Sequence, residues 1–205
     1  MSTEERKTIY LCLARMSEEG YEQKYVKEAF DTNWVVPMGP NVNAFEQNLA
    51  DFANANSDGS KLARKVVCLS AGTAAVHLAL IACGVKAGDE VCVQSFTFCA
   101  SSHPITYLGA KPVFIDSERE TWNMDPELLE KAIIERKAAI GKYPKAIIPV
   151  ALYGMPYDCE RIMAIADKYG IPVIEDAAEG LGSRFNGQVL GTFGRFGVLS
   201  FNGNK

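Results

Sequence analysis

The residue best suited to covalent chemistry in this chain is Lys205, which follows a short apolar segment ending near Ser200. A lysine amine can form a Schiff base with an aldehyde, which overcomes the weak nucleophilicity of an amine that is protonated at neutral pH. Most lysines in loops are simply solvated charges. The chemical interpretation of Lys205 therefore depends on the residues at the ends of the other predicted strands.

A phosphate-binding turn is predicted at residues 70–73, where a strand joins directly to a helix. The small residues Ala71 and Gly72 leave room for a ligand, and the amides of Gly72 and Thr73 would point outward at the positive end of the helix dipole. Such a joint is also common in proteins that bind nothing there. The Rossmann glycine fingerprint and the P-loop lysine are both absent from this turn.

Acidic residues follow the apolar pair Val173-Ile174. An ionised Asp176 at this strand end would be costly without a cation or hydrogen-bond donors beside it, and a protonated ring nitrogen would be such a partner. Alternatively, Asp176 caps the following turn or pairs with an arginine. Glu179 comes three residues later and reaches the same pocket if the turn is helical.

Alternating aromatic rings lie at another strand end, in residues 95–98. The alternation would direct one ring into the core and the other across the cleft, and Phe98 is the better candidate to stack on a planar ligand. Most such phenylalanines belong to the core. A phosphate-binding turn, a stacking ring, an acid and a lysine together predict pyridoxal 5′-phosphate as the cofactor.

The elements that must position these residues alternate as short apolar strands and helices. Strands are expected at residues 65–69, 90–94, 112–115, 146–150, 173–175 and 197–200. Helices are expected at 73–83, 98–107, 126–140 and 159–169. Strands that are apolar on both faces are typical of a parallel sheet covered by helices, and ligands collect at the carboxyl ends of such strands. The sequence therefore predicts an α/β fold with its site at one edge of the sheet.

Residues 1–60 are expected to form an arm with two helices, at 18–30 and 43–53. The stretch between them, 33–40, contains two prolines and a glycine and must be irregular. A polar loop at 54–61 then leads into the main domain, residues 61–205.

Composition excludes several classes of function. With 48% hydrophobic and 22% charged residues, the chain is typical of a soluble globular protein, and its net charge of −4 without a basic run argues against nucleic-acid binding. The six cysteines, Cys12 among them, form no CxxC pair, and only two histidines are present, so no metal site is expected. Residues 1–7 and the short apolar stretch that follows do not resemble a secretory leader, and no run reaches the length of a membrane span. A cytoplasmic location is expected.

The sequence resembles the DegT/DnrJ/StrS-type sugar aminotransferases, which are pyridoxal-phosphate enzymes of the aspartate aminotransferase fold (fold type I). The segments that carry the resemblance are 70–80, 95–98, 109–116, 174–179 and 200–205. The resemblance implies the N-terminal part of a large domain with a mainly parallel, seven-stranded sheet. Relatives are longer and add a C-terminal small domain, so the chain is expected to be a fragment of a longer protein.

The resemblance also implies a role for each candidate residue. Lys205 would carry the Schiff base, Asp176 would keep the pyridine nitrogen protonated, and Glu179 would lie near the phenolic oxygen. The implied cofactor-binding residues are Ala71, Gly72, Thr73, Phe98, Asp176, Glu179, Ser200, Asn202 and Lys205. The implied nucleotide-sugar contacts are Asn33, Trp34, Val35 and Val36. Ala151 stands where many relatives have a histidine, so residue 151 cannot perform any function that this histidine has in the relatives.

Within the family, the sequence is most similar to enzymes that aminate C4 of a UDP-linked 4-keto-6-deoxy-N-acetylhexosamine, on the route to bacillosamine-type sugars. This implies transamination from L-glutamate, in a homodimer with shared active sites, for surface polysaccharide or glycan biosynthesis. Alternatives are 3- or 4-amination of a dTDP-linked keto sugar, a noncatalytic regulatory pyridoxal-phosphate-binding protein, and a plain nucleotide-binding domain. A sugar dehydratase is a further alternative, which Lys205 opposes because those relatives carry histidine in its place.

Overall fold

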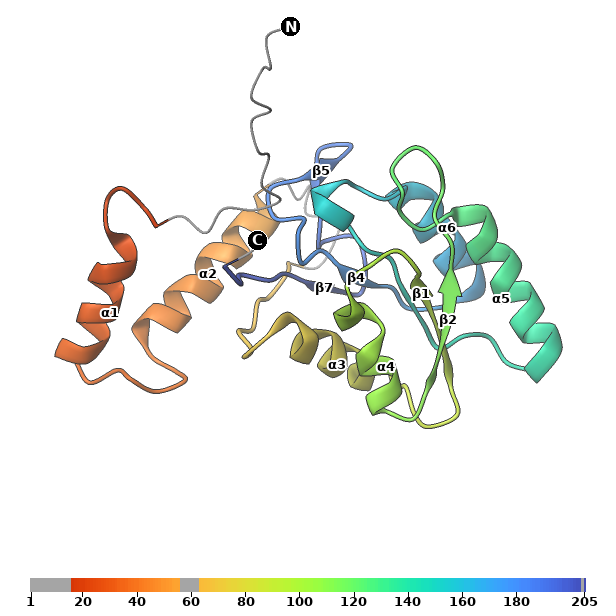
Figure 1. Cartoon of the computed structure of the whole chain (residues 1–205), viewed down its shortest axis with the longest axis horizontal. Coiled ribbons are helices and arrows are strands. Elements are labelled where there is room, and N and C mark those ends of the chain that lie inside the picture. Colours follow the sequence, from red (N-terminus) through yellow and green to blue (C-terminus); the bar gives the residue numbers. More distant parts are fainter. Residues whose placement is uncertain (1–15, 56–62, 204) are drawn as a thin grey trace, which may run out of the picture.

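The computed structural model describes residues 16–55, 63–203 and 205, and the chain folds there around a parallel sheet covered by helices on both faces (Figure 1). The segment considered as a leader, Cys12, most of the loop at 54–61 and Asn204 lie outside the described residues. The predicted α/β class with a mainly parallel sheet is confirmed. Of the seven strands implied by the resemblance, the described residues supply five that run parallel.

The sheet has β1 at the centre of one half, with β2 and β3 hydrogen-bonded in parallel on either side. In the other half, β4 pairs in parallel with β7. Bridges from Ile147 to Val173 and from Val150 to Asp176 join β3 to β4, which gives the order β2-β1-β3-β4-β7. The strands are β1 (Glu90–Gln94), β2 (Lys111–Ile115), β3 (Ala146–Ile148), β4 (Ile174–Asp176) and β7 (Phe196–Val198).

Successive residues of β1 enter two different hydrophobic cores. Val91 and Val93 pack with Leu80 on the side of α3 (Gly72–Ala82) and α4 (His103–Tyr107). Cys92, between them, packs with Leu129 on the side of α5 (Pro126–Ile140) and α6 (Cys159–Tyr169). This alternation is the period-two geometry of a strand, and it explains why Val91, Cys92 and Val93 are apolar in succession.

The helices α5 and α6 begin and end where the sequence signals predict. The side chain of Asp125 accepts hydrogen bonds from the backbone N–H groups of the first turn of α5, and Asp158 does the same for α6. Gly141 and Gly170 follow the two helices with positive φ, a backbone conformation that favours glycine.

Two predictions of secondary structure were wrong. Residues 65–69 form no strand, because the described chain places no strand beside them; instead the Cys68 N–H donates to Glu46 Oε1 at 2.7 Å. The predicted helix at 98–107 is divided into a 3-10 turn, η1 (Cys99–Ser101), and the short helix α4. An antiparallel hairpin of β5 (Arg184–Phe185) and β6 (Gln188–Val189) was not predicted.

The arm contains the two predicted helices, α1 (Tyr21–Asp31) and α2 (Pro40–Asn54), on one side of the sheet (Figure 1). Phe45 of α2 packs edge-on against Phe201, with ring centroids 4.9 Å apart, so α2 lies beside the segment that leads to Lys205. Within the described ranges, no helix is both long and apolar enough to cross a membrane.

Candidate active site

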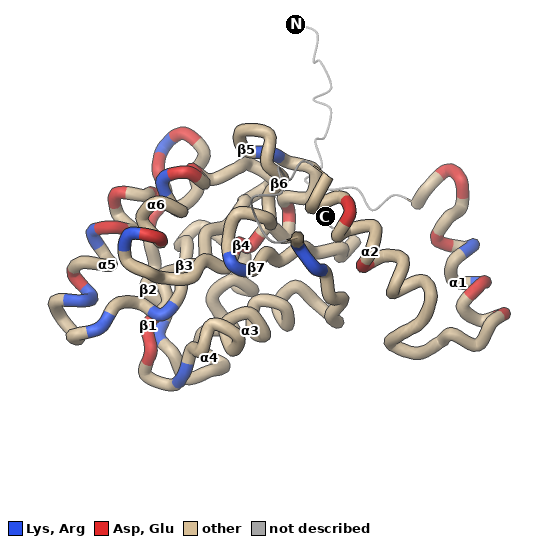
Figure 2. The backbone as a smooth tube through the Cα atoms, turned by 180° about the vertical axis from the view of Figure 1, so that it is seen from behind, with Lys and Arg blue, Asp and Glu red and all other residues tan. Residues whose placement is uncertain are grey.

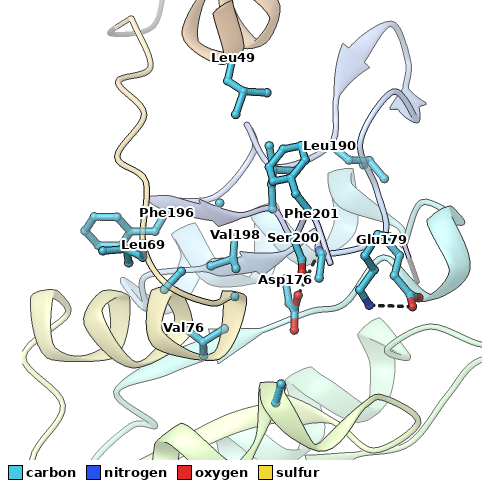
Figure 3. A pocket seen from close by; sticks show the side chains of 18 of the residues that line it. Leu49, Leu69, Val76, Asp176, Glu179, Leu190, Phe196, Val198, Ser200 and Phe201 are labelled. Atoms are coloured by element: carbon cyan, nitrogen blue, oxygen red, sulfur yellow. Dashed lines mark hydrogen bonds and ion pairs between the residues drawn. The ribbon is translucent and has the colours of Figure 1, made fainter. Parts of the chain in front are cut away.

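A cleft of about 1090 Å³ opens at the carboxyl ends of the parallel strands (Figure 3). Its walls come from the loops after β1, β3, β4 and β7, from the start of α3 and from α2. The structure brings together in this cleft every residue predicted to bind the cofactor: Ala71, Gly72, Thr73, Phe98, Asp176, Glu179, Ser200, Asn202 and Lys205. Their roles remain predictions.

Asp176 ends β4 as a carboxylate that is only 5% exposed. Its Oδ2 accepts a hydrogen bond from Ser101 Oγ at 2.5 Å, and its Oδ1 accepts one from the Ala178 N–H at 3.2 Å. Burial raises the pKa of Asp176, while these hydrogen bonds and the charge of Lys205 act to lower it. The Ala178 contact is the turn cap that was the alternative interpretation, and no arginine in the described residues forms an ion pair with Asp176. A cationic ligand atom in the cleft would therefore be stabilised there.

The amine of Lys205 is held by Glu179, with 3.1 Å between Nζ and Oε1. The residue as a whole is exposed, yet its side chain is only 17% exposed, because the amine extends into the cleft. Glu179 in turn accepts a hydrogen bond at 2.6 Å from the backbone N–H of Tyr153, which has the positive φ of 53°. Three segments thus fix the position of one amine.

The start of α3 lies at the edge of the cleft without a side-chain cap. Unlike α5 and α6, α3 has no side-chain cap; Ala71 precedes it in an extended conformation. The first N–H groups of a helix lack partners within the helix and carry its positive dipole end. A Cβ on Gly72 would lie 3.5 Å from Cβ of Ser200, so glycine leaves open the space between this turn and the serine.

The two aromatic rings after β1 both face the cleft. Phe98 is 71% exposed and lines the cleft, and its role as a stacking ring stays a prediction. The expectation that the other ring enters the core was wrong: Phe96 is 46% exposed and lies 6.0 Å from the Trp122 ring. The core beneath is already filled by the aliphatic residues of β1.

The four arm residues predicted to contact a nucleotide sugar, Asn33 to Val36, are exposed and do not line the cleft. They follow α1, at a turn where Asn33 has a positive φ of 60°. Within one copy of the described chain, the structure does not bring them to the other candidate residues.

Two sets of residues near the cleft were not predicted from the sequence. The buried Ser101 donates a hydrogen bond to Asp176, and the partly exposed Thr97 shares a hydrogen bond with the Ser101 hydroxyl. Glu175, fully buried, accepts hydrogen bonds from the Gly191 and Phe193 N–H groups and so fastens the loop before β7. Serine and threonine are common in turns, and no pattern in the sequence links residues so far apart. The described residues contain no cluster of three or more side chains suited to a metal ion.

The site matches the three chemical features of pyridoxal 5′-phosphate. The uncapped α3 turn and Ser200 suit its phosphate, Asp176 suits a protonated ring nitrogen, and Lys205 suits an aldehyde. Gly72 agrees with this match, because a side chain there would point at Ser200, the other residue that suits the phosphate.

Comparison with known proteins gives a consistent result. The model of the DegT/DnrJ/EryC1/StrS aminotransferase family matches residues 16–205. EpsN of Bacillus subtilis, assigned as a pyridoxal phosphate-dependent aminotransferase, is 53% identical over 97% of this chain and 48% of its own length. GDP-perosamine synthase of Escherichia coli O157:H7 is 39% identical over 96% of this chain and 50% of its own length.

Solved structures give the same match. Spr1654 of Streptococcus pneumoniae, assigned as a sugar aminotransferase, superposes in its apo form with a TM-score of 0.81 at 31% identity, over 96% of this chain and 49% of that one. The same protein also matches in its PLP form, with a TM-score of 0.72, and in its PMP form, with 0.75. The chain spans about half the length of the curated relatives it matches.

Proposed function

Because the chain belongs to the DegT/DnrJ/EryC1/StrS aminotransferase family, we propose that it carries the cofactor site of a pyridoxal-phosphate-dependent sugar aminotransferase. The observation that carries this proposal is the convergence, in one cleft, of the buried Asp176, the Lys205 amine and the uncapped start of α3. These groups come from three segments distant in the sequence, and each suits a different part of one ligand.

The chain's own residues have separable tasks in this proposal. When bound, pyridoxal phosphate supplies an aldehyde that links covalently to amines and a ring that withdraws electron density. Lys205 would hold the aldehyde of the cofactor through its Nζ, and the same amine would serve as a base beside the substrate's α carbon. Glu179 orients that Nζ, and Asp176 keeps a proton on the ring nitrogen. The amides of Gly72 and Thr73, with Ser200, bind the phosphate.

We further propose L-glutamate as the amino donor and, as acceptor, the C4 keto group of a UDP-linked 4-keto-6-deoxy-N-acetylhexosamine. Support comes from the resemblance and from relatives whose names specify nucleotide-linked sugars, such as GDP-perosamine synthase. That relative favours one alternative acceptor, a GDP-linked keto sugar. A dTDP-linked sugar, aminated at C3 or C4, is the other alternative.

The proposal is tested by measuring transamination with the protein as the cell produces it. The protein is saturated with pyridoxal phosphate and mixed with L-glutamate and UDP-, GDP- or dTDP-linked keto sugars, and 2-oxoglutarate and the sugar product are quantified. We expect turnover with the UDP-linked 4-keto sugar. Turnover with another sugar alone would reject the substrate but keep the enzyme class. Cofactor binding without turnover on any sugar would indicate a noncatalytic protein.

A homodimer with shared active sites is also proposed. Figure 2 shows the helices α3 and α4 without charged residues, and their exposed side chains include Leu78, Ile81 and Tyr107. An uncharged face with large apolar side chains is typical of an interface between subunits. Light scattering after size-exclusion chromatography should give a dimer mass, and Leu78→Glu should reduce it to that of a monomer.

We place this activity in the cytoplasm. The five described cysteines, Cys68, Cys83, Cys92, Cys99 and Cys159, are all unpaired, as is typical of proteins in a reducing compartment. Fractionation of cells that make the protein tests the location.

A further inference from the structure

Behind Asp176 lies a pair of hydroxyl groups from the segment after β1. Ser101, which is 1% exposed, places its Oγ 2.5 Å from Asp176 Oδ2, and Thr97 Oγ1 lies 2.8 Å from the same Ser101 Oγ. The set of site residues predicted from the sequence does not contain Ser101 or Thr97. Ser101 is buried, whereas Thr97 is partly exposed and lines the cleft, and the three side chains form one continuous chain of hydrogen bonds.

The direction of this chain follows from donor counting. An ionised carboxylate only accepts hydrogen bonds, so the single Ser101 hydroxyl proton must be donated to Asp176. The Ser101 oxygen is then left as an acceptor, and Thr97 donates to it. With Asp176 ionised, the order of donation is therefore Thr97 to Ser101 to Asp176.

We propose that Ser101, supported by Thr97, is a positioning residue that keeps the Asp176 carboxylate ionised and oriented toward the cleft, so that a protonated ring nitrogen can pair with it. The identity of the ring rests on the proposed function. The hydrogen bonds do not depend on the identity of the ring, so the role of Ser101 and the proposed function can be tested separately.

Electrostatics support the role. Burial raises the pKa of Asp176, and the hydrogen bond from Ser101 is the first of the effects that oppose burial. Without that donor, a buried carboxylate oxygen loses its partner and its affinity for a proton increases. A proton shared with a ring nitrogen would then move toward the carboxylate, and the ring would lose the positive charge that makes it withdraw electrons.

The same short turn also positions the candidate stacking ring. Phe98 immediately precedes η1 and Ser101 ends it, and the Ser101 N–H donates to the Phe98 carbonyl at 3.1 Å. Anchoring Ser101 on Asp176 therefore also fixes the turn from which Phe98 extends.

One test observes the ring nitrogen directly. The whole protein is loaded with pyridoxal phosphate labelled with ¹⁵N in the ring, and its ¹⁵N chemical shift is measured at pH 7. We expect a value near that of a protonated pyridine in the wild type and a shift toward the unprotonated value in Ser101→Ala, with the cofactor bound about tenfold more weakly. Ser101→Thr, which keeps the hydroxyl, should restore the wild-type shift.

Variants of two neighbours make the test decisive. Thr97→Val should move the ¹⁵N shift in the same direction as Ser101→Ala but less, and Thr97→Ser should not move it. Ser102→Ala is the matched control, because the Ser102 hydroxyl bonds only to the Cys99 carbonyl among the described contacts, at 3.3 Å. An unchanged ring shift in folded Ser101→Ala and Thr97→Val would overturn the proposal.

A second test needs no cofactor. The carboxyl of Asp176 is titrated by ¹³C NMR in the cofactor-free protein, where Ser101→Ala should raise its pKa above the wild-type value and Ser102→Ala should not. An equal pKa in both variants would overturn the role of Ser101 whatever the protein catalyses. A raised pKa together with no binding of pyridoxal phosphate would instead reject the proposed function.

Discussion

Lys205 Nζ and Glu179 Oε1 lie 3.1 Å apart, and this ion pair holds the lysine amine in the lining of the cleft. The second oxygen of Glu179 is occupied by the Tyr153 N–H. The acid therefore has one partner in the backbone and one in the amine, and its orientation determines that of the amine.

Replacing Glu179 with alanine should loosen the amine without unfolding the protein. The pair is partly exposed, so its contribution is about 1 kcal/mol, and the affinity for pyridoxal phosphate should fall about fivefold. Glutamine, which keeps one acceptor oxygen, should have a smaller effect. Absorbance titrations with the cofactor measure both, with the exposed Glu160→Gln as the control. Equal affinity in Glu179→Ala and wild type would show that the pair does not position Lys205.

Lys205→Ala should abolish both the covalent attachment of pyridoxal phosphate and transamination. The reason is that no other amine among the described residues is paired with Glu179 in the cleft. Borohydride reduction followed by peptide mass spectrometry should locate the cofactor at residue 205 in the wild type and nowhere in the variant. Lys131→Ala, an exposed site on α5, is the control and should retain the label. A labelled Lys205→Ala protein would contradict the assignment.

Gly72→Ala should weaken cofactor binding while leaving the fold intact. The new Cβ would make ordinary contact with Ser200 at 3.5 Å, so the protein itself can accept it, but the methyl group would occupy the space next to the α3 amides. We expect an unchanged melting temperature, weaker binding of pyridoxal phosphate and loss of competition by inorganic phosphate. Gly203→Ala, where a Cβ meets no atom within 4 Å, should change none of these. Unaltered phosphate competition in Gly72→Ala would place the anion site elsewhere.

Glu175→Ala should be strongly destabilising, because the N–H groups of Gly191 and Phe193 would lose their acceptor in a buried place. The expected loss is about 2–4 kcal/mol in the free energy of unfolding, measured with urea. Glu175→Gln keeps one acceptor and buries no charge, so its cost should be smaller. An equal stability of wild type and Glu175→Ala would show that this loop is not fastened by the acid.

The same acid should make stability depend on pH. Burial raises the pKa of Glu175 above its ordinary value of 4.5, so as the pH falls toward 4.5 the folded state binds this proton before the unfolded state does. Its contribution to stability therefore increases as the pH falls through that window and is lost as the pH rises through the raised pKa. The stability difference between wild type and Glu175→Gln, followed from neutral pH down to 4.5, should grow in favour of the wild type. A difference that stays constant would contradict the raised pKa.

Local signals explain what the sequence could predict. Asp125, Pro126 and Gly141 define both ends of α5 without help from distant residues, because capping acts within one turn. The grouping of the candidate cofactor-binding residues was equally predictable, since the carboxyl ends of parallel strands share one edge. The hairpin was missed although Asn186-Gly187, both with positive φ, carries a strong turn signal; its strands have only two residues each.

Non-local contacts explain the rest. Whether residues 65–69 become a strand depends on a hydrogen-bonding neighbour, which no periodicity reveals. The Ser101 donor to Asp176 belongs to a different strand-loop unit, and serine has no pattern that separates a buried donor from a turn residue. In the sequence, Glu175 is part of an acidic strand end. Only the packing shows that its carboxylate faces a loop rather than the cleft.

Strand β4 presents its two acids in succession to opposite faces of the sheet, Glu175 toward the loop before β7 and Asp176 toward the cleft. A shift of this strand by a single residue would turn each side chain to the opposite face, so that one of the two places would receive the apolar neighbour Ile174 or Ala177 instead of an acid. The strand is therefore intolerant of insertions and deletions on two independent grounds. A variant that kept the fold but changed the length of β4 would remove the Asp176 carboxylate from the cleft. Restoring that carboxylate would require restoring the register of β4 first.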